Sequence, residues 1–379
     1  MSLDLKINNI FLLNYRNHKE LRVDVDKNII LIFGENGSGK TNILESISLL
    51  RVNSGFRGSK LLSIINNKQE FNENIFGAKF CLTDSDGMHN VVIKIKKRLD
   101  QYKKIIKLND KEVSLKAFHE KINMFWILPK MNNIFLSSSS ERRIFLDSMI
   151  FSYDLNHKKS VSEYNKLQKE RLKIIKHFND KSFNAEWLDI IERKLASLGV
   201  IICDARRQFS KKINFFSSQM KTPLPKIQLL MKGELDLEFE KNPALSVEEN
   251  LVKRFFKNRK VDSIIGKTSL SVNQTDFDIF NENNKQFAVD CSTGEQKVIL
   301  VSIIFLFIQV LKEKKFSKII FLLDDIFAFL DNRYSSLIFQ ELLDLNIQTW
   351  ITNVNKDCIK EDSKFFHNVK FINIEDIRM

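Results

Sequence analysis

Eight consecutive residues of this sequence, Gly34 to Thr41, have the types and the spacing that bind phosphate. They read Gly-Glu-Asn-Gly-Ser-Gly-Lys-Thr. Small residues let backbone N–H groups wrap around phosphate oxygens, and the following helix would present its positive end to the same anion. Lys40 would neutralise the β- and γ-phosphates, and the Thr41 hydroxyl would ligate Mg²⁺. We therefore expect a nucleoside triphosphate to be bound by Gly34, Glu35, Asn36, Gly37, Ser38, Gly39, Lys40 and Thr41.

Two adjacent carboxylates, Asp324 and Asp325, are the second feature with clear chemistry. They follow residues 319–323, whose continuous apolar pattern is that of a buried strand. Acids at the end of a core strand are costly unless a positive charge compensates them. In a phosphate-binding protein that charge is magnesium, so Asp324 would hold the ion and Asp325 would orient or deprotonate the attacking water. The alternative is that the two acids simply begin a surface loop.

Strands and one helix must position these residues. The apolar residues 29–33 predict a buried strand before the phosphate-binding loop, and residues 41–50 predict a helix after it. Residues 319–323 and 349–351 predict two more buried strands. Together with 29–33 they suggest a mostly parallel core sheet. The early part of the chain alternates apolar and polar residues, as around residues 91–95, which predicts an antiparallel layer against the loop.

Two further motifs give this set a family likeness. Residues 292–296 read Ser-Thr-Gly-Glu-Gln at the start of an expected helix. Asp331 comes shortly after the predicted strand that ends in Asp324 and Asp325. Together with the phosphate-binding loop, these residues resemble the signature motif, Walker B motif and D-loop of ABC-type ATPases. The resemblance implies that Ser292 and Gly294 contact the γ-phosphate of ATP held by a second protomer, in a dimer with two ATP molecules between subunits. Asp331 joins the nucleotide-binding set on the same ground, whereas Ser292 taken alone would be an ordinary helix N-cap.

The spacing of the motifs indicates which branch of the ABC-type ATPases the chain resembles. Thr41 and Ser292 lie 251 positions apart (292 minus 41), which leaves room for a second lobe that a transporter ATPase lacks. The chain resembles the bacterial RecF family from end to end, in residues 3–7, 11–17, 34–41, 56–57, 136–147 and 324–331. The resemblance implies a weak, DNA-stimulated ATPase that acts as an ATP-dependent clamp on DNA. Such a clamp works at gaps and single-strand/double-strand junctions, with RecO and RecR, to help RecA load during recombinational repair.

Some positions depart from the family pattern. Residues 271–275 lack an expected Gly-Pro-His-Arg run, Glu295 stands where glutamine or arginine is more usual, and Thr352 stands where many ABC enzymes keep a histidine. These departures keep open a binding module that dimerises with ATP but has lost hydrolysis. A transport ATPase is a further alternative, which would need a surface for docking a membrane subunit.

The predicted fold class is α/β: an ABC-type P-loop ATPase lobe, with a mixed sheet and an antiparallel layer, interrupted by a largely helical second lobe. We expect the ATPase lobe to comprise residues 1–126 and 287–379, and the helical lobe residues 127–286. A coiled-coil-like arm is indicated by apolar residues spaced three and four apart, which are Leu188, Ile191, Leu195, Leu198, Ile202, Ala205 and Phe209. The arm would embrace DNA or pack within the helical lobe, and the two roles are compatible.

Composition agrees with a soluble, cytoplasmic protein. The chain has 379 residues, of which 43% are hydrophobic and 28% charged, enough for a core and about two lobes. Its four cysteines are scattered and predict neither disulfides nor a zinc site. The sequence starts without a signal-peptide pattern, and the longest apolar run, 298–311, is short for a membrane span. We expect it to be a buried helix.

A net charge of +13 suits a polyanionic partner such as DNA. Ordinary solvated lysines would give the same total. Arg57, soon after the phosphate-binding loop, is a sharper candidate for a phosphate contact, unless it pairs with a nearby carboxylate. The other candidate contacts form three groups: Lys94, Lys96, Lys97, Arg98, Lys103, Lys104 and Lys107; Arg206, Arg207, Lys211 and Lys212; and Lys253, Arg254, Lys257, Arg259 and Lys260.

Overall fold

The computed structural model divides the chain into two units. It describes residues 5–51, 55–59, 61–65, 77–98, 101–115, 118, 122–152, 154–176, 185–313, 319–328 and 330–377. Unit 1 comprises Met1–Asn132, Thr222–Leu224 and Lys312–Met379, and unit 2 comprises Asn133–Lys221 and Pro225–Leu311. The lobe boundaries expected from the sequence stay a prediction, and they differ from these units chiefly in the helix after Ser292.

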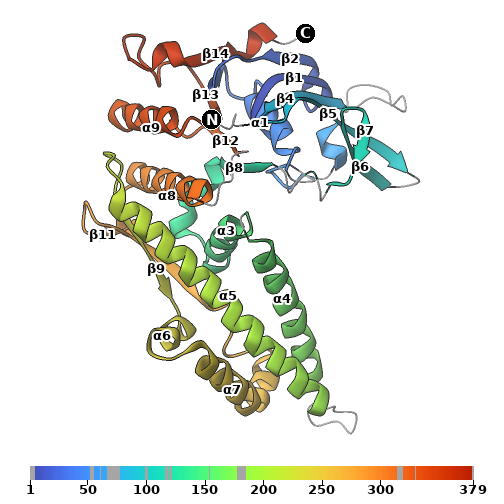
Figure 1. Cartoon of the computed structure of the whole chain (residues 1–379), viewed down its shortest axis with the longest axis vertical. Helices are drawn as coiled ribbons and strands as arrows, with labels where there is room; N and C mark the ends of the chain where they lie inside the picture. The colour runs from blue at the N-terminus through green and yellow to red at the C-terminus, as the bar shows by residue number, and fades with distance from the viewer. Residues whose placement is uncertain are drawn as a thin grey trace. The chain divides into compact units, whose positions relative to one another are not determined.

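A five-stranded parallel sheet lies at the centre of unit 1 (Figure 1). Its order is β14-β3-β13-β12-β8, and every pair of neighbours is parallel. The strands are β3 (Ile29–Phe33), β8 (Asn123–Ile127), β12 (Ile319–Asp324), β13 (Gln348–Asn353) and β14 (Val369–Asn373). Because both faces are covered, β12 and β13 are buried along their whole length. The expected parallel core sheet is confirmed.

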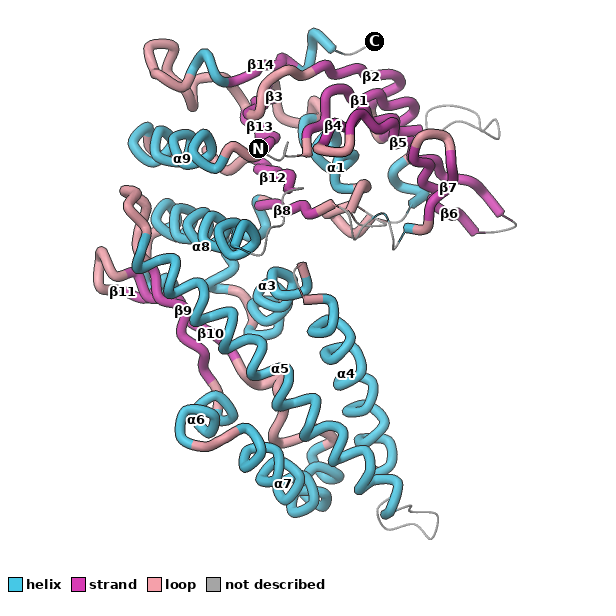
Figure 2. Tube along the Cα trace, viewed as in Figure 1, coloured by secondary structure: helices cyan, strands magenta, loops and turns pink. Residues whose placement is uncertain are grey.

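The second sheet of unit 1 is antiparallel, as the alternating pattern predicts. Its order is β2-β1-β4-β5-β6-β7, formed by β1 (Lys6–Tyr15), β2 (His18–Asp24), β4 (Gly77–Asp84), β5 (Gly87–Arg98), β6 (Gln101–Leu108) and β7 (Lys111–Val113). Helix α1 (Lys40–Ser48) packs into one hydrophobic core with both sheets (Figure 2). Ile43 and Ile47 of α1 are fully buried there. This packing holds the start of α1 at the carboxyl ends of the parallel strands.

Unit 1 also contains α9 (Asn332–Leu345), whose Phe339 stacks on Phe327 with ring centroids 4.8 Å apart. Short 3₁₀ helices occur along the chain as η1 (Leu61–Ile64), η2 (Pro129–Leu136), η3 (Ala288–Asp290), η4 (Phe366–Asn368) and η5 (Ile374–Ile377).

Unit 2 is largely helical. Its helices are α3 (Ser139–Phe151), α4 (Leu155–Ile175), α5 (Ala185–Gln219), α6 (Glu234–Lys241), α7 (Ala244–Ile265) and most of α8 (Thr293–Glu313). A three-stranded antiparallel sheet of order β11-β10-β9 accompanies them, a feature that the sequence analysis did not anticipate. Its strands are β9 (Ile227–Lys232), β10 (Asp276–Asn281) and β11 (Gln286–Phe287).

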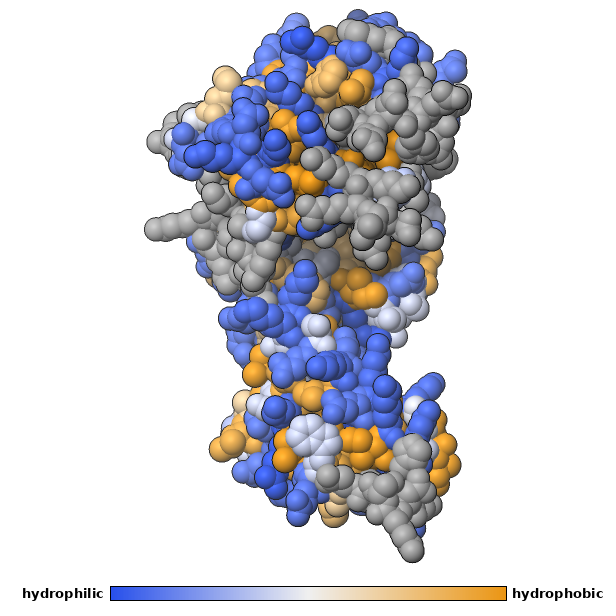
Figure 3. All heavy atoms as spheres, turned by 90° about the vertical axis from the view of Figure 1, so that its right-hand side faces the viewer, coloured by the Kyte–Doolittle hydropathy of each residue, from blue (hydrophilic) through white to orange (hydrophobic). Residues whose placement is uncertain are grey.

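The apolar stripe on α5 packs within unit 2. Leu195 and Ile202 are fully buried in a core that also includes Tyr164 of α4 and Leu251 of α7. Helices α4 and α7 therefore pack against the predicted coiled-coil seam of α5, which supports internal packing for this stripe. On the face drawn in Figure 3, hydrophilic residues cover most of unit 2, with hydrophobic patches between them.

Buried ion pairs also join α4, α5 and α7. Arg171 binds Glu192 (Nε–Oε1, 2.9 Å) and Asp262 (Nη1–Oδ2, 2.7 Å), and all three side chains are almost fully buried. Arg259 of α7 contacts the same Glu192 (Nε–Oε2, 3.0 Å). Because removing one partner would leave an uncompensated buried charge, this cluster fixes how the three helices pack.

Helix α8 is the apolar run that the sequence analysis expected to be buried. At 21 residues it is long and apolar enough to cross a membrane, but 83% of its most hydrophobic window is buried inside the protein. Burial of this kind is typical of a core helix, as expected.

Candidate nucleotide-binding site

The phosphate-binding loop has the backbone that its glycines predict. Gly37 and Gly39 have φ values of 81° and 103°, in the left-handed region that favours glycine. A Cβ atom on Gly39 would lie 2.5 Å from Nε2 of His18, so a side chain is excluded there on two grounds. Helix α1 begins at Lys40 immediately after this glycine. The loop therefore leads directly into a helix N-terminus, the arrangement that receives an anion.

The Lys40 ammonium folds back over the loop. Its Nζ donates to the carbonyl oxygens of Gly34 and Glu35 at 2.6 and 2.7 Å. Burial lowers the pKa of Lys40, and the nearby charges of Asp325 and Asp324 oppose that effect. A bound phosphate would offer this ammonium stronger, charge-assisted acceptors than the two carbonyl groups.

Asp324 lies where three elements converge. Its Oδ1 accepts hydrogen bonds from Oγ1 of Thr41 on α1, at 2.8 Å, and from Oγ1 of Thr352 on β13, at 2.7 Å. Asp324 and Thr352 are register partners in the parallel sheet, which explains their meeting. The two residues proposed for Mg²⁺, Thr41 and Asp324, are thus in direct contact although 283 positions separate them.

Thr352 also fixes the backbone of Asp325. The Asp325 N–H donates to Oγ1 of Thr352 at 3.1 Å, while the same hydroxyl donates to Asp324. Asp325 has a φ of 52°, an uncommon conformation for a residue with a side chain. In the sequence, Thr352 stands out only because many ABC enzymes keep a histidine at this position. Its place opposite Asp324 is a consequence of strand register, which the sequence does not reveal.

Residues of the β1–β2 turn support the loop from one side. Nδ2 of Asn17 donates to the Ser38 carbonyl at 3.2 Å, and Nε2 of His18 lies 3.3 Å from the Gly39 carbonyl oxygen. Nδ2 of Asn42 on α1 donates to Oδ1 of Asn17 at 2.7 Å. The sequence does not mark Asn17 or His18 for this role, because β3 and most of β2 separate them from the loop.

A hollow of about 710 Å³ opens beside the loop, within the usual range for small-molecule sites. It is lined by Phe33, Gly34, Glu35, Asn36, Gly37, Ser38, Val354, Asn373 and Glu375. All of these residues belong to unit 1. The contribution of Asn373, the last residue of β14, and of Glu375 in the following η5 is not evident from the sequence.

The donor set fits Mg²⁺ held jointly with a nucleotide. Within the described residues, no group of three or more His, Cys, Asp or Glu side chains forms a metal site by itself. Thr41 and Asp324 offer one hydroxyl and one carboxylate at the same point. Mg²⁺ is commonly bound through one or two protein oxygens, with phosphates and water completing its shell.

Comparisons with known proteins decide the family. The RecF/RecN/SMC N-terminal domain matches residues 6–373. The chain is 32% identical to the DNA replication and repair protein RecF of Rickettsia typhi, over 92% of this chain and 94% of the relative. RecF of Rickettsia prowazekii is also 32% identical, over 93% and 96%. The chain belongs to the RecF family.

Solved structures confirm the RecF/SMC head-domain fold. The structure of the recombination mediator protein RecF-ATPrS in the RecFOR pathway superposes with a TM-score of 0.77 at 24% identity, covering 98% of this chain and 99% of the other. The Smc head domain of Pyrococcus furiosus, bound to the C-terminal domain of ScpA, gives a TM-score of 0.52 at 14% identity, covering 93% and 91%. The fold and family expected from the motifs are both confirmed.

The signature residues of this RecF-family chain begin α8 as a capping box. The Ser292 hydroxyl and backbone N–H both donate to Oε2 of Glu295, at 2.8 and 2.9 Å. These bonds lower the pKa of Glu295. Gly294 lies in the first turn of the same helix, and Asp331 caps α9 by accepting from the Tyr334 N–H at 2.9 Å. The structure thus gives Ser292 and Asp331 capping roles, and their contact with nucleotide stays a prediction.

Many of the basic side chains considered as DNA contacts are buried or form ion pairs within this RecF-family chain. Arg206 is buried and forms a bidentate pair with Asp147, at 2.8 and 2.9 Å. Arg254 and Arg259 pair with carboxylates of α6 and α5, and Lys104 is buried. The side chains of Lys96, Lys97 and Arg98 lie outside the described part of the chain. The candidates that remain exposed include Lys94, Lys103, Lys211, Lys253, Lys257 and Lys260.

Proposed function

We propose that this chain binds ATP and Mg²⁺ at the loop 34–41, dimerises around two nucleotides and clamps DNA as a RecF-type repair protein. One observation carries the proposal: Thr41, Asp324 and Thr352 converge by hydrogen bonds at the first turn of the phosphate-binding helix. Two hydroxyls on one carboxylate at this position suit an ATP–Mg²⁺ site. The names of its relatives, DNA replication and repair protein RecF, supply the process.

In this mechanism the loop amides and Lys40 bind the β- and γ-phosphates, exchanging the carbonyl contacts of the lysine for phosphate oxygens. Thr41 and Asp324 would hold Mg²⁺, which would neutralise charge on the phosphates. Asp325 orients the attacking water and accepts its proton. Ser292 and Gly294 of each protomer contact the nucleotide of the other. ATP shifts the equilibrium toward the dimer because it binds the dimer more tightly than the monomer. Hydrolysis removes ATP and with it this preference, so the clamp reopens.

The exposed lysines of both units suit the DNA backbone, which they would contact without reading sequence. Action at gaps and junctions in the cytoplasm, with RecO, RecR and RecA as partners, follows the RecF resemblance. The related structure is named as part of the RecFOR pathway.

Light scattering of the purified protein, with phosphate release measured in the same samples, tests the proposal. We expect a doubling of mass that needs ATP and Mg²⁺, and turnover that rises with a gapped duplex. Lys40→Ala should abolish nucleotide binding, and Ser292→Arg should block dimerisation while monomeric binding persists. Dimerisation of Ser292→Arg at the wild-type ATP concentration would contradict the sandwich.

A second candidate is a module that dimerises with ATP but does not hydrolyse it. Thr352 favours it, because a hydroxyl that bonds both acidic residues stands where many ABC enzymes keep a histidine, and a hydroxyl does not take up a proton near neutral pH as an imidazole does. Full ATP-dependent dimerisation without phosphate release, in the presence of DNA, would establish this alternative.

A further inference from the structure

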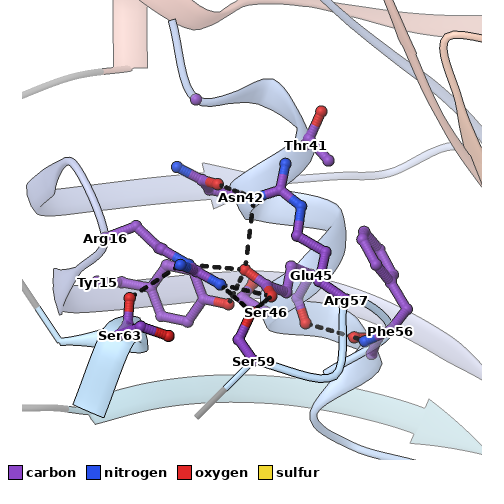
Figure 4. A network of polar contacts seen from close by, with 12 residues as sticks. Tyr15, Arg16, Thr41, Asn42, Glu45, Ser46, Phe56, Arg57, Ser59 and Ser63 are labelled. Carbon is purple, nitrogen blue, oxygen red and sulfur yellow. Dashed lines mark hydrogen bonds and ion pairs between the residues drawn. The ribbon is translucent and has the colours of Figure 1, made fainter. Parts of the chain in front are cut away.

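A buried carboxylate on the phosphate-binding helix gathers two arginines. Glu45 of α1 is 0% exposed. Its Oε1 accepts from Nη2 of Arg16 at 2.7 Å, and its Oε2 accepts from Nε of the same arginine at 2.9 Å (Figure 4). Nη1 of Arg57 lies 3.8 Å from Oε2. These three residues come from the β1–β2 turn, α1 and the loop 55–59.

Neutral donors complete the shell of Glu45. The Tyr15 hydroxyl donates to Oε2 at 3.3 Å, and the Ser59 hydroxyl donates to Oε1 at the same distance. Burial, and then the charge of Glu45, raise the pKa of Tyr15 well above its usual value, so its phenol is a neutral donor. Gly55 passes so close that a Cβ on it would lie 2.9 Å from Cγ of Glu45. The loop 55–59 is therefore wrapped tightly around this carboxylate.

Arg57 is the outward member of the cluster. One carboxylate cannot neutralise two guanidinium groups, and Arg16 already forms a bidentate pair with it. Arg57 is 39% exposed, and its Nη1 donates to Oδ1 of Asn42 at 2.9 Å. Asn42 follows Thr41, the proposed Mg²⁺ ligand, in the first turn of α1. The surplus positive charge thus lies at the end of α1 that receives phosphate.

We infer that Glu45 is a positioning residue, which holds Arg57 beside the first turn of α1 for a phosphate of the bound nucleotide. The inference rests on the proposed function, because it assumes that ATP binds at the loop. Glu45 does not touch the ligand itself. Its effect on binding passes through the guanidinium of Arg57, which is fixed between Glu45 and Asn42.

A double-mutant cycle separates positioning from simple electrostatics. Removing the negative charge of Glu45 would by itself attract phosphate more strongly, so electrostatics alone predicts tighter binding by Glu45→Gln. Positioning predicts the reverse. We expect Arg57→Ala to lose about tenfold in affinity, the size of one charge-assisted hydrogen bond. Glu45→Gln should lose a similar factor, and the double variant should lose no more than Arg57→Ala alone.

The experiment titrates a fluorescent ATP analogue, with Mg²⁺, into the full chain and each variant. Thermal melting checks that each variant is folded. Glu341→Gln is the matched control, because Glu341 is another buried glutamate of unit 1, on α9, and should leave affinity unchanged. If Glu45→Gln does not fold, Glu45→Asp decides, since it keeps a negative charge in the cluster but shortens the side chain by one methylene, which lengthens the 3.8 Å contact with Arg57. The same loss of affinity is expected.

Three results would overturn the inference. The first is wild-type or tighter binding by Glu45→Gln, and the second is additive losses in the double variant. The third is unchanged ATP affinity in Arg57→Ala together with weakened binding to a DNA duplex. That result would show that Arg57 contacts a phosphate of the DNA backbone and not one of the nucleotide. If the wild-type chain itself fails to bind the analogue, the proposed function fails, a result that the variants cannot imitate.

Discussion

Lys104 makes the stability of unit 1 depend on pH in a calculable way. This lysine of β6 is 3% exposed, and its ammonium donates to the carbonyl of Leu49 at the C-terminal end of α1. Burial lowers the pKa of Lys104 from 10.5 to about 7. We predict that Lys104→Met stabilises the protein at pH 6 and loses most of that advantage by pH 10.

The sign follows from proton uptake. The unfolded chain binds a proton on Lys104 below pH 10.5, whereas the folded chain binds it only below about pH 7, so unfolding takes up a proton between these values and stability rises with pH. At 1.36 kcal/mol per pKa unit, the lowered pKa of Lys104 reduces the free energy of unfolding by about 5 kcal/mol at pH 6 and by about 1 kcal/mol at pH 10. The negative end of α1 favours the charged lysine and offsets part of this cost. We expect the advantage of the Met variant to shrink by about 2 to 4 kcal/mol between the two pH values.

Urea unfolding of both proteins at a series of pH values measures this difference. Groups that titrate equally in both chains cancel in the comparison. Lys103→Met is the control, because Lys103 is an exposed lysine on the same strand and its replacement should give a small, pH-independent change. A constant difference between wild type and Lys104→Met from pH 6 to pH 10 would refute the reasoning.

Three further variants test the site. Thr352→Val removes a hydroxyl that serves both acidic residues, so we expect kcat to fall at least tenfold with little change in KM, measured by phosphate release. Glu295→Gln frees the Ser292 hydroxyl from a carboxylate, and the ATP concentration for half-dimerisation should fall in light scattering; a rise would show that the capping box supports the interface. Gly39→Ala brings a Cβ against His18 at a left-handed φ, which should cost about 2 kcal/mol or more and abolish binding of the ATP analogue. The double variant with His18→Ala should relieve only the steric part of that loss.

The features predicted well from the sequence were those with local signatures. The glycines around Ser38, the strand before Asp324 and the apolar run of α8 each have a pattern within a few residues, and each forms the expected element. The long α5 also follows from its spacing of three and four. A short sequence window contains enough information when the structure depends on backbone conformation and on one buried face.

The remaining features depend on which distant segments meet. Thr352 contacts Asp324 because β13 and β12 pair in one register, and Asn17 reaches the loop because β1 and β2 turn beside it. The basic groups show the same limit, since Arg206 and Arg259 look like exposed cations in the sequence but are paired within unit 2. Counting cations overestimates how many of them lie exposed, because the sequence does not say which arginines have buried partners.

The position of β3 has a consequence for how the protein is made. This strand pairs on one side with β13 and on the other with β14, so both of its neighbours come from the last part of the chain. Phe33 precedes Thr349 by 316 positions (349 minus 33), which a ribosome covers in roughly 15 to 60 seconds. During that time the nascent chain carries an apolar strand with two open edges, a template for aggregation unless a chaperone covers it. A product shortened before β13 would lack both partners of β3, the strand that leads into the phosphate-binding loop, and would also lack Thr352.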